Sequence, residues 1–251
     1  MELNKSLFIE KRSGATHLSL DGKWQFTYFE RPADDILSIS YKLTATLPQS
    51  AGWCLFESGE LPHPYYGTNS EKYKFITDRV FYFNRRFDVS KDMQGSSYAY
   101  LCFDGCAYYT RVWLNGVLLG QHEGMFGGPV VEISKLLKYG ETNEITVETT
   151  ACNYGCAGDI DESGKYGMKT WSSGKSAIVP WNLVNDSATT NGHFNVIGIW
   201  RSVRIEFLPE YHITNPYLYT ESVYCENGAE NAKVRLEIPI CTPFTEEHQG
   251  L

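Results

Sequence analysis

The sequence of 251 residues predicts an all-β fold, and within that class a jelly-roll β-sandwich. Apolar and polar side chains alternate in several short stretches, which is the pattern of half-buried strands. Gly, Pro and Asn residues that favour turns separate these stretches. No window of helical length carries a convincing apolar stripe at the helical period. Long connections between the strands favour a jelly roll over a barrel.

The predicted strands begin near the N-terminus. In residues 18–28 one face of the strand carries the apolar side chains of Leu18, Leu20, Trp24, Phe26 and Tyr28. In residues 81–89 one face carries Phe81, Phe83, Phe87 and Val89. Residues 97–103 are apolar on both faces, as expected of a strand covered on both sides. Residues 143–149 follow, and residues 198–207 then alternate Ile199, Val203, Ile205 and Phe207 with Ser202, Arg204 and Glu206.

The dipeptide Asn115-Gly116 lies between two apolar runs and predicts a two-residue hairpin turn. The favoured turn needs positive φ at both central positions, which Asn and Gly tolerate best. This turn pairs Leu114 with Val117 and Val112 with Leu119 on one face, and it places Trp113 and Leu118 on the other. We therefore assign structural roles to Trp113, Asn115 and Gly116.

Two arginines share strand parity with apolar residues. Arg201 has the parity of Ile199 and Val203, and Arg85 lies in the same way within residues 81–89. A guanidinium that points inward without a partner is costly. We therefore expect a carboxylate partner for each, and a structural role for Arg85 and Arg201 in preference to a catalytic one.

Composition excludes some classes of function. The formal net charge of -8 argues against binding to nucleic acid, which needs clustered Lys and Arg. No apolar stretch approaches the length of a membrane helix, and the N-terminus lacks the apolar core of a signal peptide. We therefore expect a cytoplasmic protein without membrane contact, a trimmed signal being the alternative. The odd count of 7 Cys favours free thiols over a complete disulfide framework.

Several segments together resemble a known family. "LDGKWQF", "NRRFDV", "VWLNG", "TNEITVET" and "GIWRSVRIEF" occur in the order and spacing of the N-terminal sugar-binding domain of glycoside hydrolase family 2. That family includes β-galactosidases, β-glucuronidases and β-mannosidases, and the resemblance covers about residues 18–207. "HPYYGTNSEKYKF" is most similar to the β-mannosidases, whereas "HFNVIGIWR" is more similar to the other two branches. The sugar therefore stays open.

The resemblance implies a galactose-binding-like jelly roll followed by an immunoglobulin-like domain and a TIM barrel with two catalytic glutamates. We expect residues 1–208 to form the sandwich, and residues 209–251 to form a linker and the start of an incomplete immunoglobulin-like domain. No catalytic residue is then expected here, and the missing domains of an exo-β-glycosidase would be the partners. A free-standing lectin-like module and a purely structural scaffold are the alternatives, and a homo-oligomer stays open.

Two long loops, residues 55–79 and 152–195, hold the candidate carbohydrate-binding residues. Aromatic faces and amides suit a sugar, which offers both an apolar C–H face and hydroxyls. The candidates are Tyr65, Tyr66, Asn69 and Tyr73 in the first loop, with Trp171, Trp181, His193 and Asn195 in the second. The alternative, which we favour, is that these loops only dock on the missing domains. The family often has a substrate-binding aspartate where Gly192 stands here, whereas Asn195 matches an asparagine of the glucuronidases.

Other motifs favour structural interpretations. Asp159, Asp161 and Ser163 are spaced like the first ligands of a calcium loop, but Thr170 occupies the position of its glutamate. We therefore expect a solvated acidic turn and no cofactor or metal, with calcium at these three residues as the weaker alternative. His122 and Glu123 are adjacent on a strand and should point to opposite faces. Asn143-Glu144 only superficially resembles the family's acid/base motif, since it enters a strand. Gly124, Gly127 and Gly128 are expected to allow a tight bend.

Overall fold

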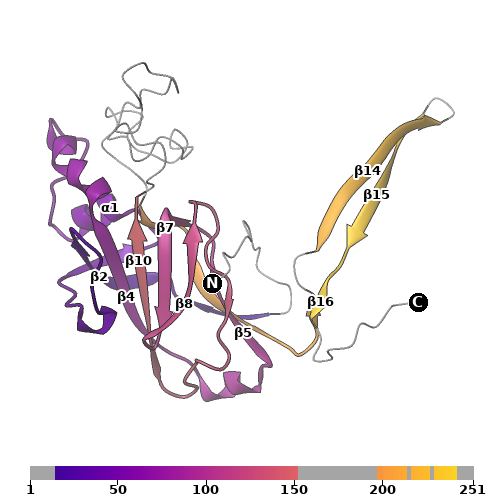
Figure 1. The fold of residues 1–251 in the computed structure, drawn as a ribbon, viewed down its shortest axis with the longest axis horizontal. Coiled ribbons are helices and arrows are strands. Elements are labelled where there is room, and N and C mark those ends of the chain that lie inside the picture. Colours follow the sequence, from indigo (N-terminus) through magenta and orange to yellow (C-terminus); the bar gives the residue numbers. More distant parts are fainter. Residues whose placement is uncertain (1–14, 152–196, 214–215, 227–228, 242–251) are drawn as a thin grey trace.

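The computed structural model describes residues 15–151, 197–213, 216–226 and 229–241, and it confirms the predicted all-β sandwich (Figure 1). One antiparallel sheet has the strand order β3 (Leu43–Leu47), β2 (Gly22–Phe29), β4 (Val80–Asp88), β10 (Thr142–Thr150), β7 (Tyr109–Leu114) and β8 (Val117–Glu123). The other has the order β1 (Thr16–Ser19), β12 (Val203–Leu208), β5 (Tyr98–Phe103) and β9 (Val131–Glu132). Neighbouring strands are mostly distant in sequence, as in a jelly roll.

Shorter elements complete the described chain. The strand pairs are β6 (Cys106–Ala107) with β11 (Gly198–Ile199), β13 (His212–Ile213) with β16 (Ile240–Cys241), and β14 (Tyr217–Glu226) with β15 (Ala229–Glu237). The helices are α1 (Ala51–Glu57) and the 3₁₀ segments η1 (Ile36–Ser38), η2 (Asn69–Asp78) and η3 (Lys91–Gly95). The sequence did not predict α1, because seven residues are too few to display a helical period.

The core lies between the two sheets and is rich in aromatic side chains. Phe26 on β2 and Phe83 on β4 are fully buried, with stacked rings whose centroids are 5.8 Å apart. The single strand expected over residues 18–28 is wrong, because β1 and β2 belong to different sheets. The chain turns at Gly22, whose φ of 117° is a conformation that glycine tolerates. Leu20 and Trp24 nevertheless both reach the core, as the alternation predicted.

The Arg85 side chain stabilises the turn between β1 and β2, where the chain passes from one sheet to the other. Its Nη1 donates to the backbone carbonyl oxygens of Leu20 and Asp21, at 2.7 and 2.6 Å. The Asp21 carboxylate in turn accepts a hydrogen bond of 2.9 Å from the backbone N–H of Val203 on β12. Burial lowers the pKa of Arg85, and the nearby Asp21 charge opposes this. The expected carboxylate contact is thus replaced by two carbonyl contacts.

The β7–β8 hairpin turns at Asn115-Gly116, with positive φ at both residues, 51° and 83°. The predicted pairs Leu114 with Val117 and Trp113 with Leu118 are confirmed. The pair Val112 with Leu119 is wrong, because a bulge between Val112 and Trp113 skips Leu119 and sets Val112 opposite Gly120. Trp113 itself is buried, and the guanidinium carbon of Arg111 lies 5.4 Å from its ring centroid.

Asn115 also joins the hairpin to the start of β10. Its Nδ2 donates to the Leu136 carbonyl and to Asn143 Oδ1, each at 2.9 Å, and its Oδ1 accepts from the backbone N–H of Glu144 at 3.0 Å. Asn143 is fully buried and donates to the Lys138 carbonyl at 2.9 Å. These bonds satisfy buried backbone groups of the turn. The Asn143-Glu144 dipeptide is therefore part of the scaffold.

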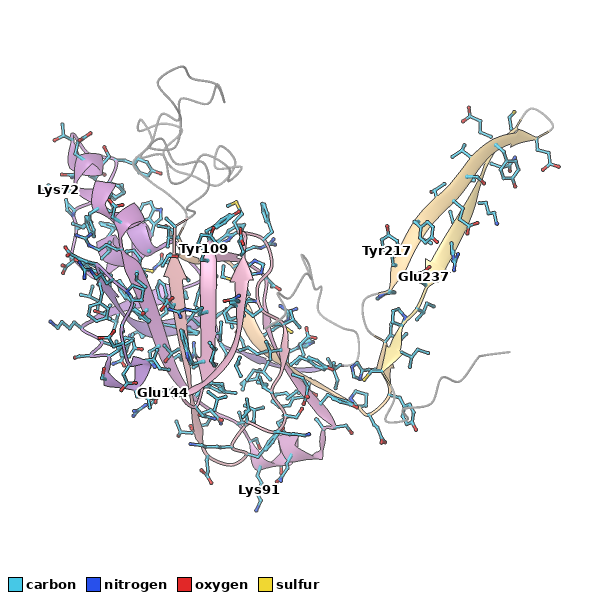
Figure 2. The ribbon with its side chains drawn as sticks, viewed as in Figure 1. Lys72, Lys91, Tyr109, Glu144, Tyr217 and Glu237 are labelled. Carbon is cyan, nitrogen blue, oxygen red and sulfur yellow. The ribbon has the colours of Figure 1, made fainter. Side chains whose placement is uncertain are left out.

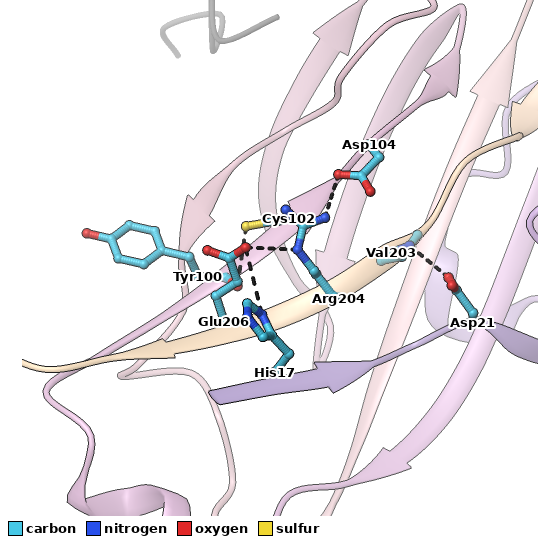
Figure 3. A network of polar contacts seen from close by, with 8 residues as sticks. All are labelled: His17, Asp21, Tyr100, Cys102, Asp104, Val203, Arg204 and Glu206. Carbon is cyan, nitrogen blue, oxygen red and sulfur yellow. Dashed lines mark hydrogen bonds and ion pairs between the residues drawn. The ribbon is translucent and has the colours of Figure 1, made fainter. Parts of the chain in front are cut away.

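The outer face of the four-stranded sheet carries a buried ionic network (Figure 3). Arg204 Nε donates to Glu206 Oε1 at 2.8 Å, and its Nη1 donates to Asp104. Burial alone would lower the pKa of Arg204, but the bonds to Asp104 and Glu206 raise it. His17 Nδ1 lies 3.9 Å from Glu206. The face of β12 that the alternation marked as polar is thus buried as well.

The buried arginine expected at position 201 is therefore found at position 204. Arg201 is only partly buried, and its guanidinium carbon lies 5.6 Å from the centroid of the Trp200 ring. Its side chain packs on Gly105, where an added Cβ would lie 2.9 Å from it. Ile199 and Val203 both reach the core, but β11 ends at Ile199 and β12 begins only at Val203. Residues 200–202 are therefore outside the strands, and strand parity does not set the direction of the Arg201 side chain.

The cross-strand register gives the β14–β15 hairpin, whose side chains Figure 2 draws, one apolar and one polar face. Cross-strand pairing places Leu218 opposite Leu236 and Val223 opposite Ala232 on the apolar face. Ion pairs lie on the other face, with Lys233 Nζ 2.7 Å from Glu221. The apolar face is exposed to solvent in the described structure, including Leu218, Val223, Val234 and Leu236.

Candidate functional site

The candidate site is built on helix α1, which begins beside residues 197–199. Ser50 caps the helix by accepting a hydrogen bond of 3.4 Å from the backbone N–H of Trp53. The backbone N–H of Ala51 donates to the Ile197 carbonyl at 2.7 Å, which fixes the helix to the sandwich. Cys54 and Leu55 face the core, whereas Trp53 and Phe56, one helical turn apart, are only partly buried.

The loop that follows α1 folds over these two rings and centres on His63. The centroid of the His63 ring lies 4.9 Å from that of Phe56 and 5.5 Å from that of Trp53. The ring centroids of Tyr66 and Tyr65 lie 4.6 and 5.7 Å from that of His63. We refer to Trp53, Phe56, His63, Tyr65 and Tyr66 as the His63 aromatic cluster. Such a cluster offers flat apolar faces with polar edges.

The first-loop candidates separate into exposed and structural residues. Tyr65 and Tyr66 are 43% and 70% exposed, so both are accessible to a ligand. Asn69 shapes the loop, because its Nδ2 donates to the His63 carbonyl at 3.0 Å. Tyr73 is fully buried, and its hydroxyl donates to the Pro62 carbonyl at 2.6 Å. Burial raises the pKa of Tyr73 to about 12.

Tyr73 is therefore a core residue, and its prediction as a sugar contact is wrong. The prediction treated loop aromatics as equally exposed, but η2 turns this ring into the interior. His63, Trp53 and Phe56 were not predicted. The spacing of Trp53 and Phe56 by three positions was a signal for a shared face, once a helix there is known.

The second-loop candidates Trp171, Trp181, His193 and Asn195 lie outside the described residues, as do Asp159, Asp161 and Ser163. The described residue at position 197 contacts the first turn of α1 through the Ala51 hydrogen bond. Among the described residues, no group of three or more His, Cys, Asp or Glu is placed to hold a metal ion.

His122 and Glu123 do not form an acid/base pair. His122 is buried opposite Thr110, whereas Glu123 lies opposite Tyr109 and is partly exposed. Burial lowers the pKa of His122 and favours its neutral form, while contacts with the Phe126 backbone and Glu123 act in the other direction. Gly124 and Gly127 have positive φ, in agreement with a tight bend, and Gly128 packs against Phe103, where an added Cβ would clash.

Buried carboxylates of the described chain are held by basic or hydroxyl groups. Glu148 receives two hydrogen bonds of 2.7 Å from Arg111 and one of 2.5 Å from the Tyr82 hydroxyl. Glu206 accepts a hydrogen bond of 2.8 Å from Arg204 Nε. A carboxylate that accepts two hydrogen bonds from one arginine, as Glu148 does, is fixed in its geometry, which suits a structural role. No helix in the described part of the chain has the length and apolar character needed to cross a membrane.

Two stacked antiparallel sheets with jelly-roll connections define a β-sandwich of the galactose-binding-like type. A family model described as "Glycosyl hydrolase 2 galactose-binding domain-like" matches residues 24–179. The chain therefore belongs to this family, as the sequence motifs predicted.

The relatives of the chain are longer enzymes. "Beta-mannosidase B" of Thermothelomyces thermophilus is 25% identical over 130 residues, which cover 52% of this chain and 14% of the relative. "Beta-galactosidase" of Thermoanaerobacter pseudethanolicus is 24% identical over 174 residues, which cover 67% of this chain and 19% of the relative. The chain thus spans less than a fifth of the length of either relative.

Solved structures share the fold. A β-D-mannosidase from Dictyoglomus thermophilum superposes with a TM-score of 0.63 at 22% identity, covering 90% of this chain and 26% of that one. The apo β-glucuronidase from Ruminococcus gnavus superposes with a TM-score of 0.60 at 19% identity, covering 96% of this chain and 36% of that one.

Proposed function

We propose that this chain is the non-catalytic N-terminal module of an exo-β-glycosidase, and that its His63 aromatic cluster helps to receive the terminal sugar. The exposure of Tyr65 and Tyr66 beside Trp53 is the observation that carries this proposal. A sugar ring stacks its C–H face on an aromatic ring, and the tyrosine hydroxyls are placed to exchange hydrogen bonds with sugar hydroxyls. Whether the sugar is a mannoside, galactoside or glucuronide is left to experiment.

The chemistry of bond cleavage would come from another segment. A retaining glycosidase needs two carboxyl groups about 5 to 5.5 Å apart across an open site, one of them with a raised pKa. The buried carboxylates Glu148 and Glu206 are each held by an arginine instead. By the family resemblance we expect the catalytic glutamates in a barrel, and this chain would then position substrate and support that barrel.

The C-terminal hairpin supports a further part of the proposal, namely that residues 209–251 begin an immunoglobulin-like domain. A two-stranded hairpin is marginally stable alone, and an apolar face needs a second sheet about 10 Å away to cover it. The exposed Leu218, Val234 and Leu236 form such a face. Strands from a longer chain would provide that sheet.

Assays of turnover and binding test the proposal together. Neither the purified chain nor its Tyr66→Ala variant should hydrolyse the nitrophenyl β-glycosides of mannose, galactose or glucuronic acid. Hydrolysis that is lost on denaturation would overturn the non-catalytic assignment.

Complementation gives the positive result. When this chain is added to a separately produced barrel fragment of a family 2 enzyme, it should restore turnover, and Tyr66→Ala should raise KM more than it lowers kcat. The matched control is Tyr211→Ala, which removes an exposed tyrosine outside the cluster. Equal effects of the two variants would refute a role for the cluster. Tight glycan binding by this chain alone would favour the lectin-like alternative.

A further inference from the structure

A groove of about 920 Å³ lies on the outer face of the six-stranded sheet, away from the His63 aromatic cluster. Strands β2, β3, β4 and β10 form its floor, and residues 36–41 form one wall. Leu37 reaches across to the β7–β8 turn, where it would lie 3.4 Å from a Cβ added to Gly116. A groove of this size is large enough for a mono- or disaccharide.

The floor of the groove is polar and largely buried. Asn84 and Thr146 are buried there, and Asn84 Nδ2 donates to Thr146 Oγ1 at 3.1 Å and to Glu144 Oε1 at 2.8 Å. The Tyr41 hydroxyl is shut away from solvent and makes no hydrogen bond shorter than 3.5 Å within the described part of the chain. Burial raises its pKa, and the nearby Thr146 and Asn84 side chains oppose this rise. A ligand hydroxyl that reached this group would supply the hydrogen bond that it lacks.

The charge of the groove is opposite to that of the chain. Its lining contains the basic residues Lys23, Arg85, Arg86 and Lys138 and a single acidic residue, Glu144. Arg85 is bonded to backbone carbonyls, and Arg86 lies 3.5 Å from Glu144. Lys23 and Lys138 are exposed at the groove. In a protein with a net charge of -8, this concentration of positive charge favours an anionic ligand.

We infer that this groove is a second carbohydrate site, specific for a saccharide that carries a carboxylate. The Tyr41 hydroxyl, the Asn84 amide and the Thr146 hydroxyl would exchange hydrogen bonds with ring hydroxyls. Lys23 or Lys138 would pair with the carboxylate, and Ile36 and Ile39 would contact the apolar edge of the sugar. The inference is independent of the proposed function, because the two sites share no residue.

Titrations with three small probes test both halves of this inference. Glucuronate, glucose and acetate are titrated into the full chain, with binding followed by calorimetry or NMR. Glucuronate should bind saturably, glucose roughly tenfold or more weakly, and acetate without saturation, since ring and charge are both needed. Raising the salt should weaken glucuronate binding. Equal binding of glucose and glucuronate, or saturable binding of acetate at the groove, would overturn the inference.

Two variants locate the binding. Tyr41→Phe removes a hydroxyl and nothing else, and it should weaken glucuronate binding by about tenfold without lowering the thermal unfolding temperature. Lys23→Gln should weaken glucuronate and leave glucose unchanged. The matched control is Tyr211→Phe, which removes an exposed hydroxyl outside both sites. If Tyr41→Phe and Lys23→Gln bind glucuronate as the parent chain does, the groove is not the site.

Discussion

Two strands of this protein carry nearly the same five residues in opposite surroundings. Residues 203–207 of β12 read Val-Arg-Ile-Glu-Phe, and residues 234–238 in and after β15 read Val-Arg-Leu-Glu-Ile. On β12 the side chains of Arg204 and Glu206 are 3% and 0% exposed. On β15 the corresponding Arg235 and Glu237 are 58% and 50% exposed. The same pattern is thus core in one place and surface in the other.

The local pairing is the same in both strands. Residues two apart in a strand share a face, so each arginine reaches the glutamate that follows it. The Nε to Oε1 distance is 2.8 Å from Arg204 to Glu206 and 3.4 Å from Arg235 to Glu237. Burial differs because β12 lies between β1 and β5, whereas β15 pairs with β14 at the edge of a two-stranded sheet. The alternation of side chains along a strand therefore determines which side chains form a pair. The neighbouring strands determine how deeply that pair is buried from solvent.

The largest difference is expected from removing one arginine from each pair. Arg204→Met should lower the free energy of unfolding by about 3 to 5 kcal/mol, because it leaves Glu206 buried and reduces the contacts of Asp104. Arg235→Met should lower it by less than about 1 kcal/mol, because water solvates Glu237. Denaturation with urea, monitored by tryptophan fluorescence, measures both values. Similar losses for the two variants would mean that burial does not determine how much the ion pair contributes to the free energy of unfolding.

A second contrast removes apolar atoms at equivalent positions. Ile205→Ala should cost about 2 to 4 kcal/mol, because Ile205 is fully buried and a cavity would remain between the sheets. Leu236→Ala should cost less than about 0.5 kcal/mol in this chain, because Leu236 is 56% exposed. The same denaturation curves provide the measurement. A cost for Leu236→Ala that matched the Ile205 value would show that another segment covers the hairpin in solution.

These contrasts show why the sequence predicted some features and not others. The Asn115-Gly116 turn follows from a backbone conformation that few residues tolerate, so adjacent residues were sufficient to predict it. The inward position of Phe81 and Phe83 follows from period two. The burial of Arg204 depends on distant strands, and no local pattern contains that information. The alternation on β12 was consistent with one solvated face, and the structure covers both.

The candidate site divides in the same way. Tyr65 and Tyr66 lie in a stretch rich in turn residues, and composition alone predicted their exposure. Tyr73 has the same residue type and similar neighbours, but η2 directs its ring inward. His63 becomes central only through contacts with Phe56 on α1, a helix too short to be recognised from its period. Tertiary packing, absent from any short window, decides these roles.

Acid should affect the sandwich more than the hairpin. The pKa of His122 in the folded protein is lower than its usual 6.5, chiefly because of burial, so the unfolded chain binds this proton first as the pH falls. His122 therefore contributes full stability above about pH 6.5, and the free energy of unfolding declines below that value. His122→Gln removes this dependence, so the two stability curves should converge as the pH falls from 8 to roughly 5. Parallel curves would show that His122 keeps its usual pKa.

The smallest expected effect concerns salt and separates the two arginine pairs without mutation. Exposed pairs are worth roughly 0.2 to 1 kcal/mol and are screened at about 1 M salt, whereas buried pairs are screened much less. Amides of β14 and β15 should therefore lose a little hydrogen-exchange protection in salt, because Lys233 and Arg235 both contact Glu221 on the solvated face. Amides of β12 should keep theirs. Arg235→Gln should reproduce part of the salt effect at low ionic strength and make added salt less effective. If salt reduced hydrogen-exchange protection equally on β12 and β15, the Arg204 network would be accessible to water. The proposed difference in salt screening between the buried and the exposed arginine pair would then be wrong.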